Sequence, residues 1–229
     1  CKRPVGLGAN LVISIFYVWV HHFPYHCERM GKGKRNPFFD NSLLLFSIVI
    51  IFWIITTIDQ NTPDWNFTQH YGIRARDMNG ILGIFLAPFL HVNYPHLIGN
   101  TLPFLALGGL VLLSGRGRFI FTSILSGAIS GIGIWVFAEK GTVHVGSSIL
   151  IFSYLGFLIM QAWFTRSIRW GLVALVAGIF YGALILTLLY QKNGISWHGH
   201  FFGFITGIVS AILVTPSPAK KKRKAIIKI

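Results

Sequence analysis

The sequence predicts an all-α membrane protein with several spanning helices. Hydrophobic residues make up 53% of its 229 residues, and charged residues only 11%. An ordinary soluble domain has about 25% charged residues, because its surface faces water. The mean hydropathy of +0.63 points the same way. These values exclude a soluble globular enzyme and a disordered chain.

The apolar residues form stretches without Asp, Glu, Lys or Arg. Each stretch can supply a helix of about 17–25 residues, which is the length that a bilayer requires. The stretches lack the alternation of barrel strands, so helices are the remaining way to satisfy the backbone in lipid. We therefore expect a bundle of six transmembrane helices, near residues 42–58, 96–113, 119–137, 148–164, 170–190 and 199–215.

The two ends of the chain differ in character from this core. Residues 1–40 are expected to form an N-terminal cytoplasmic or interfacial segment, or to add an extra helix, because the apolar run at 11–20 is short. Residues 41–215 form the predicted six-helix core, and residues 216–229 a basic cytoplasmic tail. The KKKRK run at Lys220–Lys224 resembles a nuclear localisation signal. Directly after a spanning helix, it fits better as a topology anchor that contacts anionic lipid.

The basic residues predict the orientation of the helices. The formal net charge is +14, from 20 Lys and Arg against six Asp and Glu. With an even number of spans, sixteen of the 20 basic residues fall on the side that holds both termini. The positive-inside rule makes that side cytoplasmic, so we expect a multi-pass protein of a plasma (inner) membrane. Since the basic residues lie between apolar stretches, no nucleic-acid partner is expected.

Polar side chains inside membrane helices are costly and are therefore candidates for function. The predicted topology puts seven of them at the non-cytoplasmic ends of the helices, where they converge on one leaflet. They are His91, His96, Asn100, His144, Ser148, His198 and His200.

The spacing of these residues indicates serine chemistry. His96 and Asn100 lie four residues apart, so they share one face of the second helix. Ser148 opens the fourth helix behind Gly146, where free backbone N–H groups attract negative charge. A neighbouring imidazole could activate this serine, while His96 and Asn100 could donate hydrogen bonds to an oxyanion.

The sixth helix could supply that imidazole. His200 is followed by Gly203 and Gly207, a small-residue stripe that lets two helices approach closely. If the partner is the fourth helix, His200 arrives beside Ser148.

Each feature also has a plainer explanation. A serine in a membrane helix most often bonds back to its own helix, and a glycine stripe most often serves packing. The histidines could be imagined as metal ligands. However, no HExxH motif occurs and no acidic residue lies inside a predicted span, so we expect neither a metal nor a cofactor.

Together these motifs resemble the rhomboid intramembrane serine proteases. The match covers about residues 42–215 and includes the H-x4-H-x3-N spacing of the second helix. Gly146-Ser-Ser148 falls where the family has its GxSG nucleophile motif. The matching segments are Gly72–Arg76, Ala87–His91, His96–Asn100, Leu107–Gly109, Gly146–Ser148 and Ser196–Gly203.

The resemblance implies a role for each candidate residue. Ser148 would be the nucleophile and His200 the general base, without an aspartate. Asn100 and His96 would serve the oxyanion hole together with the backbone N–H of Ser148, and His91 would have a supporting role. His198 is expected to be accessory.

Two residues depart from the family pattern. Ile149 stands where the family usually has glycine, and its β-branched side chain is expected to crowd the contact between the fourth and sixth helices. Phe152 stands where tyrosine is frequent. It can stack on His200 but cannot donate a hydrogen bond.

The expected function is an intramembrane serine endopeptidase that cleaves transmembrane protein substrates near the non-cytoplasmic boundary. Membrane lipids are its other expected partners. The alternative is a catalytically inactive relative that binds membrane helices. A transporter or channel is disfavoured because the sequence has no internal repeat. The long segment Asp59–Pro88 carries Trp65, Phe67 and Tyr71, which suit the membrane interface.

Overall fold

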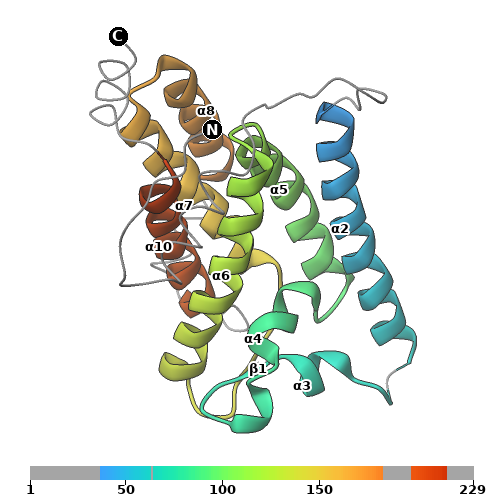
Figure 1. Ribbon diagram of the computed structural model, residues 1–229. Coiled ribbons are helices and arrows are strands. Elements are labelled where there is room, and N and C mark those ends of the chain that lie inside the picture. The colour runs from blue at the N-terminus through green and yellow to red at the C-terminus, as the bar shows by residue number, and fades with distance from the viewer. Residues whose placement is uncertain (1–36, 63, 183–196, 216–229) are drawn as a thin grey trace, which may run out of the picture. The chain divides into compact units, whose positions relative to one another are not determined.

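The computed structural model describes residues 37–62, 64–182 and 197–215. Within these ranges the chain is a bundle of long helices, as the sequence predicts (Figure 1). Five helices in this described part of the chain are long and apolar enough to cross a membrane. These are α2 (Pro37–Asn61), α5 (Tyr94–Leu112), α6 (Arg116–Phe137), α7 (Ser148–Thr165) and α10 (Trp197–Val214).

The sixth predicted span is represented by α8 (Ile168–Tyr181), which is shorter than the expected helix over 170–190. Residues 183–190 lie outside the described part of the chain, as do most of the predicted N-terminal segment and the whole of the basic tail. Helices α5 and α10 each begin two residues earlier than expected. In α5 the earlier start has a clear cause, because the side chain of Asn93 caps the helix by accepting from the backbone N–H of His96.

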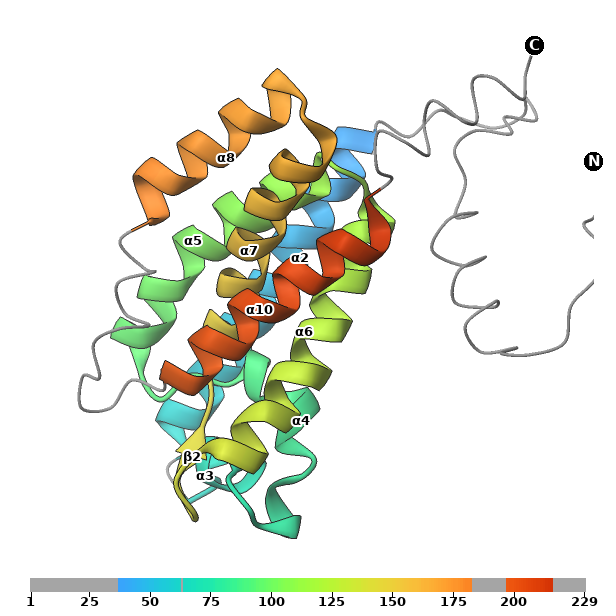
Figure 2. The same ribbon diagram turned by 90° about the vertical axis from the view of Figure 1, so that its left-hand side faces the viewer.

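The helices that carry the candidate polar residues begin at one end of the bundle. In Figures 1 and 2, α5, α7 and α10 start at the end where α3 (Phe67–Tyr71) and α4 (Gly83–Leu86) lie, whereas α6 and α8 run the opposite way. Residues that are far apart in sequence therefore meet at one level of the bundle.

The segment between α2 and α5 folds into short elements at this end of the bundle. Strand β1 pairs antiparallel with β2 (Val143–His144), and Ile73 lies opposite His144. This pairing ties the segment to the chain directly before α7. Its elements are α3 (Phe67–Tyr71), β1 (Ile73–Arg74), η1 (Met78–Gly80), α4 (Gly83–Leu86) and η2 (Ala87–Phe89).

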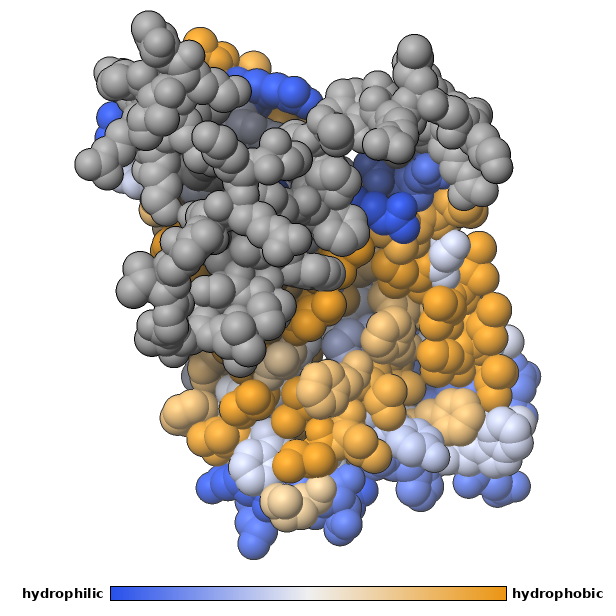
Figure 3. Space-filling view, viewed as in Figure 1, coloured by the Kyte–Doolittle hydropathy of each residue, from blue (hydrophilic) through white to orange (hydrophobic). Residues whose placement is uncertain are grey.

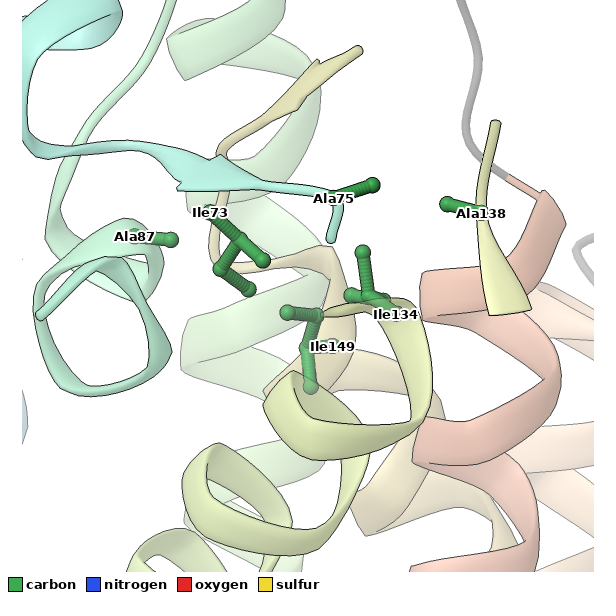
Figure 4. Packing of buried hydrophobic residues seen from close by; sticks show 6 residues of the cluster. All are labelled: Ile73, Ala75, Ala87, Ile134, Ala138 and Ile149. Atoms are coloured by element: carbon green, nitrogen blue, oxygen red, sulfur yellow. The ribbon is translucent and has the colours of Figure 1, made fainter. Parts of the chain in front are cut away.

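Ile149 does not crowd the contact between α7 and α10, so the expectation for this residue was wrong. Its side chain is 3% exposed and joins a buried cluster formed by the first loop and α6 (Figure 4). At Gly203 of α10, it is the backbone carbonyl of Ile149 that makes the close approach. The side chain points away from α10, and a glycine here would leave a gap in the cluster. The other cluster members are Ile73, Ala75, Ala87, Ile134 and Ala138.

Three glycines bring α7 and α10 into close contact. A Cβ added at Gly203 would lie 2.5 Å from the carbonyl oxygen of Ile149, and one at Gly207 would overlap the carbonyl of Ser153. In return, Gly156 of α7 lies against the carbonyl of Phe204. The two backbones therefore pack directly on each other, as small residues permit in membrane helices.

The outer faces of the bundle are apolar. Figure 3 shows hydrophobic side chains over the middle of the described surface and hydrophilic ones at its lower end. On α2, Phe52 is buried, whereas Phe46, Ile50 and Ile54 are more than half exposed. Such exposure would be unfavourable in water but suits lipid. The protein is thus an integral, multi-pass membrane protein.

Candidate active site

The start of α5 presents two of the predicted residues on one face. Asn93 and Pro95 define the first turn, and His96 and Asn100 follow one turn apart. Asn100 is 8% exposed. The Nδ1 atom of His96 and the Nδ2 atom of Asn100 are buried, and among the described residues neither has a hydrogen-bond partner. Leaving such groups unpaired is costly unless water or a ligand meets them.

The turn before Ser148 lies directly beside these two side chains. Gly146 has a φ of +123°, a conformation that favours glycine. A Cβ at this position would lie 2.8 Å from His96 Cε1 and 3.6 Å from Asn100 Nδ2. The backbone N–H of Gly146 donates to the carbonyl of Ala87, at 2.9 Å. Both the φ angle and the available space therefore require glycine here.

Ser148 is the first residue of α7 and is partly exposed. The first N–H groups of a helix have no partner within the helix, and the helix dipole adds positive potential there. The start of α7 can thus hold negative charge that develops next to the Ser148 hydroxyl.

His200 lies on α10 against the first turns of α7. Its ring stacks on Phe152, with centroids 4.1 Å apart and planes 12° from parallel. Phe152 is four residues after Ser148, so the two share a face of α7. Gly203 follows His200 by one turn of α10. A Cβ added at Gly203 would lie 3.3 Å from the Cβ of Phe152. The packing therefore holds the imidazole on the helix face that carries Ser148.

His91 contacts the residue next to the candidate nucleophile. Its Nε2 atom is 3.2 Å from Ser147 Oγ and accepts a longer bond, 3.4 Å, from the Ser147 backbone N–H. His91 also lies edge-on to His96, with centroids 5.3 Å apart, and packs on Phe52. It thus joins the nucleophile turn to α5 and α2.

His144 and His198 form a second pair beside this group. Their ring centroids lie 6.5 Å apart, and Thr142 Oγ1 is 2.8 Å from His144 Nε2. Burial lowers the pKa of His144, and repulsion from His198 lowers it further. Folding disfavours the charged form of His144. In mildly acidic solution the unfolded chain therefore binds more protons than the folded protein does.

We therefore expect acidification to destabilise the protein through His144. The free energy of unfolding should fall as the pH drops below about 6.5, the ordinary pKa of histidine. Thermal unfolding of the detergent-solubilised protein at pH 7.5 and 5.0 measures this loss, and His144→Gln should reduce it. His70→Gln is the control, because the His70 side chain is exposed on α3. An equal loss in wild type and His144→Gln would contradict the assignment.

Three residues in this region escaped the sequence interpretation as functional partners: Ser147, Asn93 and Ser126. The Ser126 hydroxyl donates to the Ile149 carbonyl at 3.2 Å, and so fixes the residue after Ser148. Asn93 could have been found, because an asparagine two residues before Pro95 is a helix-start signal. In the described ranges, no three His, Cys, Asp or Glu side chains group as metal ligands. The absence of a metal stays a prediction.

The fold and this group of residues define the class of protein: a helical membrane protein with serine, histidine and asparagine side chains gathered at one end of its bundle. A family model described as the rhomboid domain matches residues 79–217, and the chain belongs to the rhomboid family.

Three curated relatives add little about function, and one of them carries a rhomboid name. The chain is 34% identical over 202 residues to the uncharacterized protein Rv1337 of Mycobacterium tuberculosis, covering 83% of this chain and 81% of the relative. It is 33% identical over 199 residues to the uncharacterized protein ML1171 of Mycobacterium leprae, covering 83% and 78%. It is 28% identical over 143 residues to a Bacillus subtilis protein named "Putative rhomboid protease YdcA", covering 59% and 66%.

Proposed function

We propose that the protein is an intramembrane serine endopeptidase that cleaves transmembrane segments of other membrane proteins near the non-cytoplasmic boundary. The observation that carries this proposal is that His96 Nδ1 and Asn100 Nδ2 are buried without a hydrogen-bond partner among the described residues, on two side chains that lie beside the turn leading to Ser148. A binding protein has no use for unpaired donors at that point. An oxyanion hole needs them, because its donors must be in place before charge develops.

The proposed reaction uses Ser148 and His200 as a dyad. His200 takes the hydroxyl proton as Ser148 Oγ attacks the scissile carbonyl carbon, and the carbonyl oxygen becomes an oxyanion. The Ser148 N–H, Asn100 Nδ2 and His96 donate to this oxyanion. The tetrahedral intermediate collapses, the C–N bond breaks, and His200 protonates the leaving amine. Water that His200 deprotonates then hydrolyses the acyl-enzyme and frees Ser148.

A substrate helix must unwind before this reaction can occur. Its carbonyls are occupied by its own hydrogen bonds, since lipid offers no alternative partner. Substrates with helix-weakening residues at the membrane boundary should therefore be preferred. The proposal places both termini of the chain in the cytoplasm, with residues 41–215 as the protease core, 216–229 as a cytoplasmic tail and 1–40 as a separate N-terminal segment.

Asn100→Ala is expected to lower the cleavage rate by about 100- to 1,000-fold, because it removes one oxyanion donor. The effect should fall on kcat more than on KM, since the donor acts on charge that exists only during reaction. Steady-state cleavage of a membrane reporter measures both constants. Asn61→Ala, at the exposed end of α2, is the control. An unchanged kcat in Asn100→Ala would remove Asn100 from the oxyanion hole.

Cleavage of a single-pass reporter in proteoliposomes tests the function itself. The reporter carries a helix-weakening glycine pair at one boundary, and mass spectrometry of the products locates the cut. We expect one cut near the non-cytoplasmic boundary, none with Ser148→Ala, and less when leucines replace the glycines. Cutting that persists in Ser148→Ala would overturn the proposal. If a panel of such reporters stays intact while a control rhomboid protease cuts them, the inactive helix-binding relative becomes the better explanation.

A further inference from the structure

Ser147 precedes the candidate nucleophile, but its hydroxyl is used differently. Ser147 is 0% exposed, so a substrate carbonyl cannot reach it. It occupies the N-cap position of α7, where a serine hydroxyl ordinarily accepts from the N–H groups of the first turn. Here it makes no such bond. The hydroxyl instead lies 3.2 Å from His91 Nε2.

The donors and acceptors of this contact fix the tautomer of His91. The backbone N–H of Ser147 can only donate, and it points at His91 Nε2 from 3.4 Å. Nε2 must therefore be the unprotonated nitrogen, and the Ser147 O–H also donates to it. The ring proton then sits on Nδ1, which is buried with no partner among the described residues.

His91 keeps this neutral form because charging it is unfavourable. The residue is 1% exposed, and burial lowers its pKa strongly. Repulsion from His96, whose ring lies edge-on to it at 5.3 Å, lowers the pKa further. His91 is thus a permanent hydrogen-bond acceptor and not a proton carrier.

We propose that the Ser147–His91 hydrogen bond positions the nucleophile turn so that the Ser148 N–H points at the oxyanion, and that it keeps the Ser147 hydroxyl from capping the first turn of α7. This inference rests on the proposed function of Ser148. Without His91, the Ser147 hydroxyl is free to rotate and cap its own helix. Ser147 and His91 are positioning residues and do not touch the substrate.

The proposal predicts an unusual order among variants. His91→Leu should lower the maximal rate at which a fluorophosphonate phosphonylates Ser148 by about tenfold or more, which is the size typical of coupled pairs. Ser147→Ala should cost less, because it removes the tether but also the competing hydroxyl. The double variant should react faster than His91→Leu alone. His91→Gln, whose amide oxygen can accept from Ser147, should recover part of the rate.

The maximal rate of phosphonylation is obtained from the dependence of the rate on probe concentration. Thermal unfolding of each variant shows whether it is folded. A double variant as slow as the product of the two single effects would overturn the proposal, because the residues would then act independently. If His91→Leu fails to fold, the phosphonylation rates of Ser147→Ala and His91→Gln are compared with the wild-type rate instead. A rate in Ser147→Ala equal to that of wild type would overturn the proposal.

A second measurement is independent of activity. Nitrogen-15 NMR of labelled histidine, assigned with His91→Gln, reports which ring nitrogen carries the proton. We expect His91 to be neutral, with the proton on Nδ1. The nitrogen-15 signal of its Nε2 should change in Ser147→Ala, because that variant removes the hydroxyl that donates to Nε2. A proton on Nε2 would overturn the pairing. If wild type is not phosphonylated at all, the proposed function fails, whereas the tautomer still tests the hydrogen bond.

Discussion

Replacing Ser148 by alanine is expected to abolish covalent labelling of the protein by a fluorophosphonate probe. The hydroxyl is the proposed nucleophile, and no other side chain at the start of α7 can replace it, because Ser147 is fully buried. His200→Ala should have nearly the same effect, since serine is a weak nucleophile without a base. Removing a member of such a unit costs about 10⁴–10⁶ in rate, and the two losses are not additive.

The experiment needs a matched serine and a measure of folding. Ser167→Ala is the control, because that serine makes no side-chain cap and precedes α8, which begins at the opposite end of the bundle (Figure 1). All variants should unfold at temperatures close to wild type. Labelling that survives in Ser148→Ala would show that another residue is the nucleophile, and labelling that survives in His200→Ala would remove His200 as the base.

Gly207→Ala is expected to be the most damaging of the conservative helix substitutions. The added methyl would overlap the carbonyl of Ser153, so α7 and α10 must separate. Overpacking of this kind costs about 1–3 kcal/mol in folded proteins, and a rigid backbone neighbour puts the cost at the upper end. Because the same contact holds His200 over α7, labelling of Ser148 should fall together with stability.

Gly178→Ala is the matched control for this prediction. Gly178 also lies in an apolar helix, and a Cβ there meets no atom of the described residues within 4 Å. Alanine should be neutral or slightly stabilising at this position, because glycine is a poor helix former. Thermal unfolding of both variants in the same detergent makes the comparison. Equal unfolding temperatures would mean that α7 and α10 do not pack through Gly207.

The sequence predicted the features that depend on local spacing. Apolar runs of bilayer length located α2, α5, α6, α7 and α10, because in lipid the backbone has few alternatives to a helix. The four-residue spacing of His96 and Asn100 predicted their shared face. The glycines after His200 predicted a close helix contact, although not which atoms would meet.

Features that depend on distant residues could not be read from the sequence. Ser147 and His91 are 56 residues apart, and long-range contacts such as the pairing of β1 with β2 and the bond from Gly146 to Ala87 bring their segments together. Ile149 misled for the same reason. The glycine that the family usually has at this position suggested a close contact with α10, whereas the fold turns the side chain toward the first loop.

The site of the fluorophosphonate adduct tests the central proposal most directly. The wild-type protein is labelled in membranes, purified and digested. Tandem mass spectrometry then shows which of the adjacent residues Ser147 and Ser148 carries the phosphonate. We expect the adduct on Ser148, and no adduct when His200 is replaced by alanine. An adduct on Ser147, or on a residue outside α7, would contradict both the proposed dyad and the role assigned to the Ser147–His91 pair.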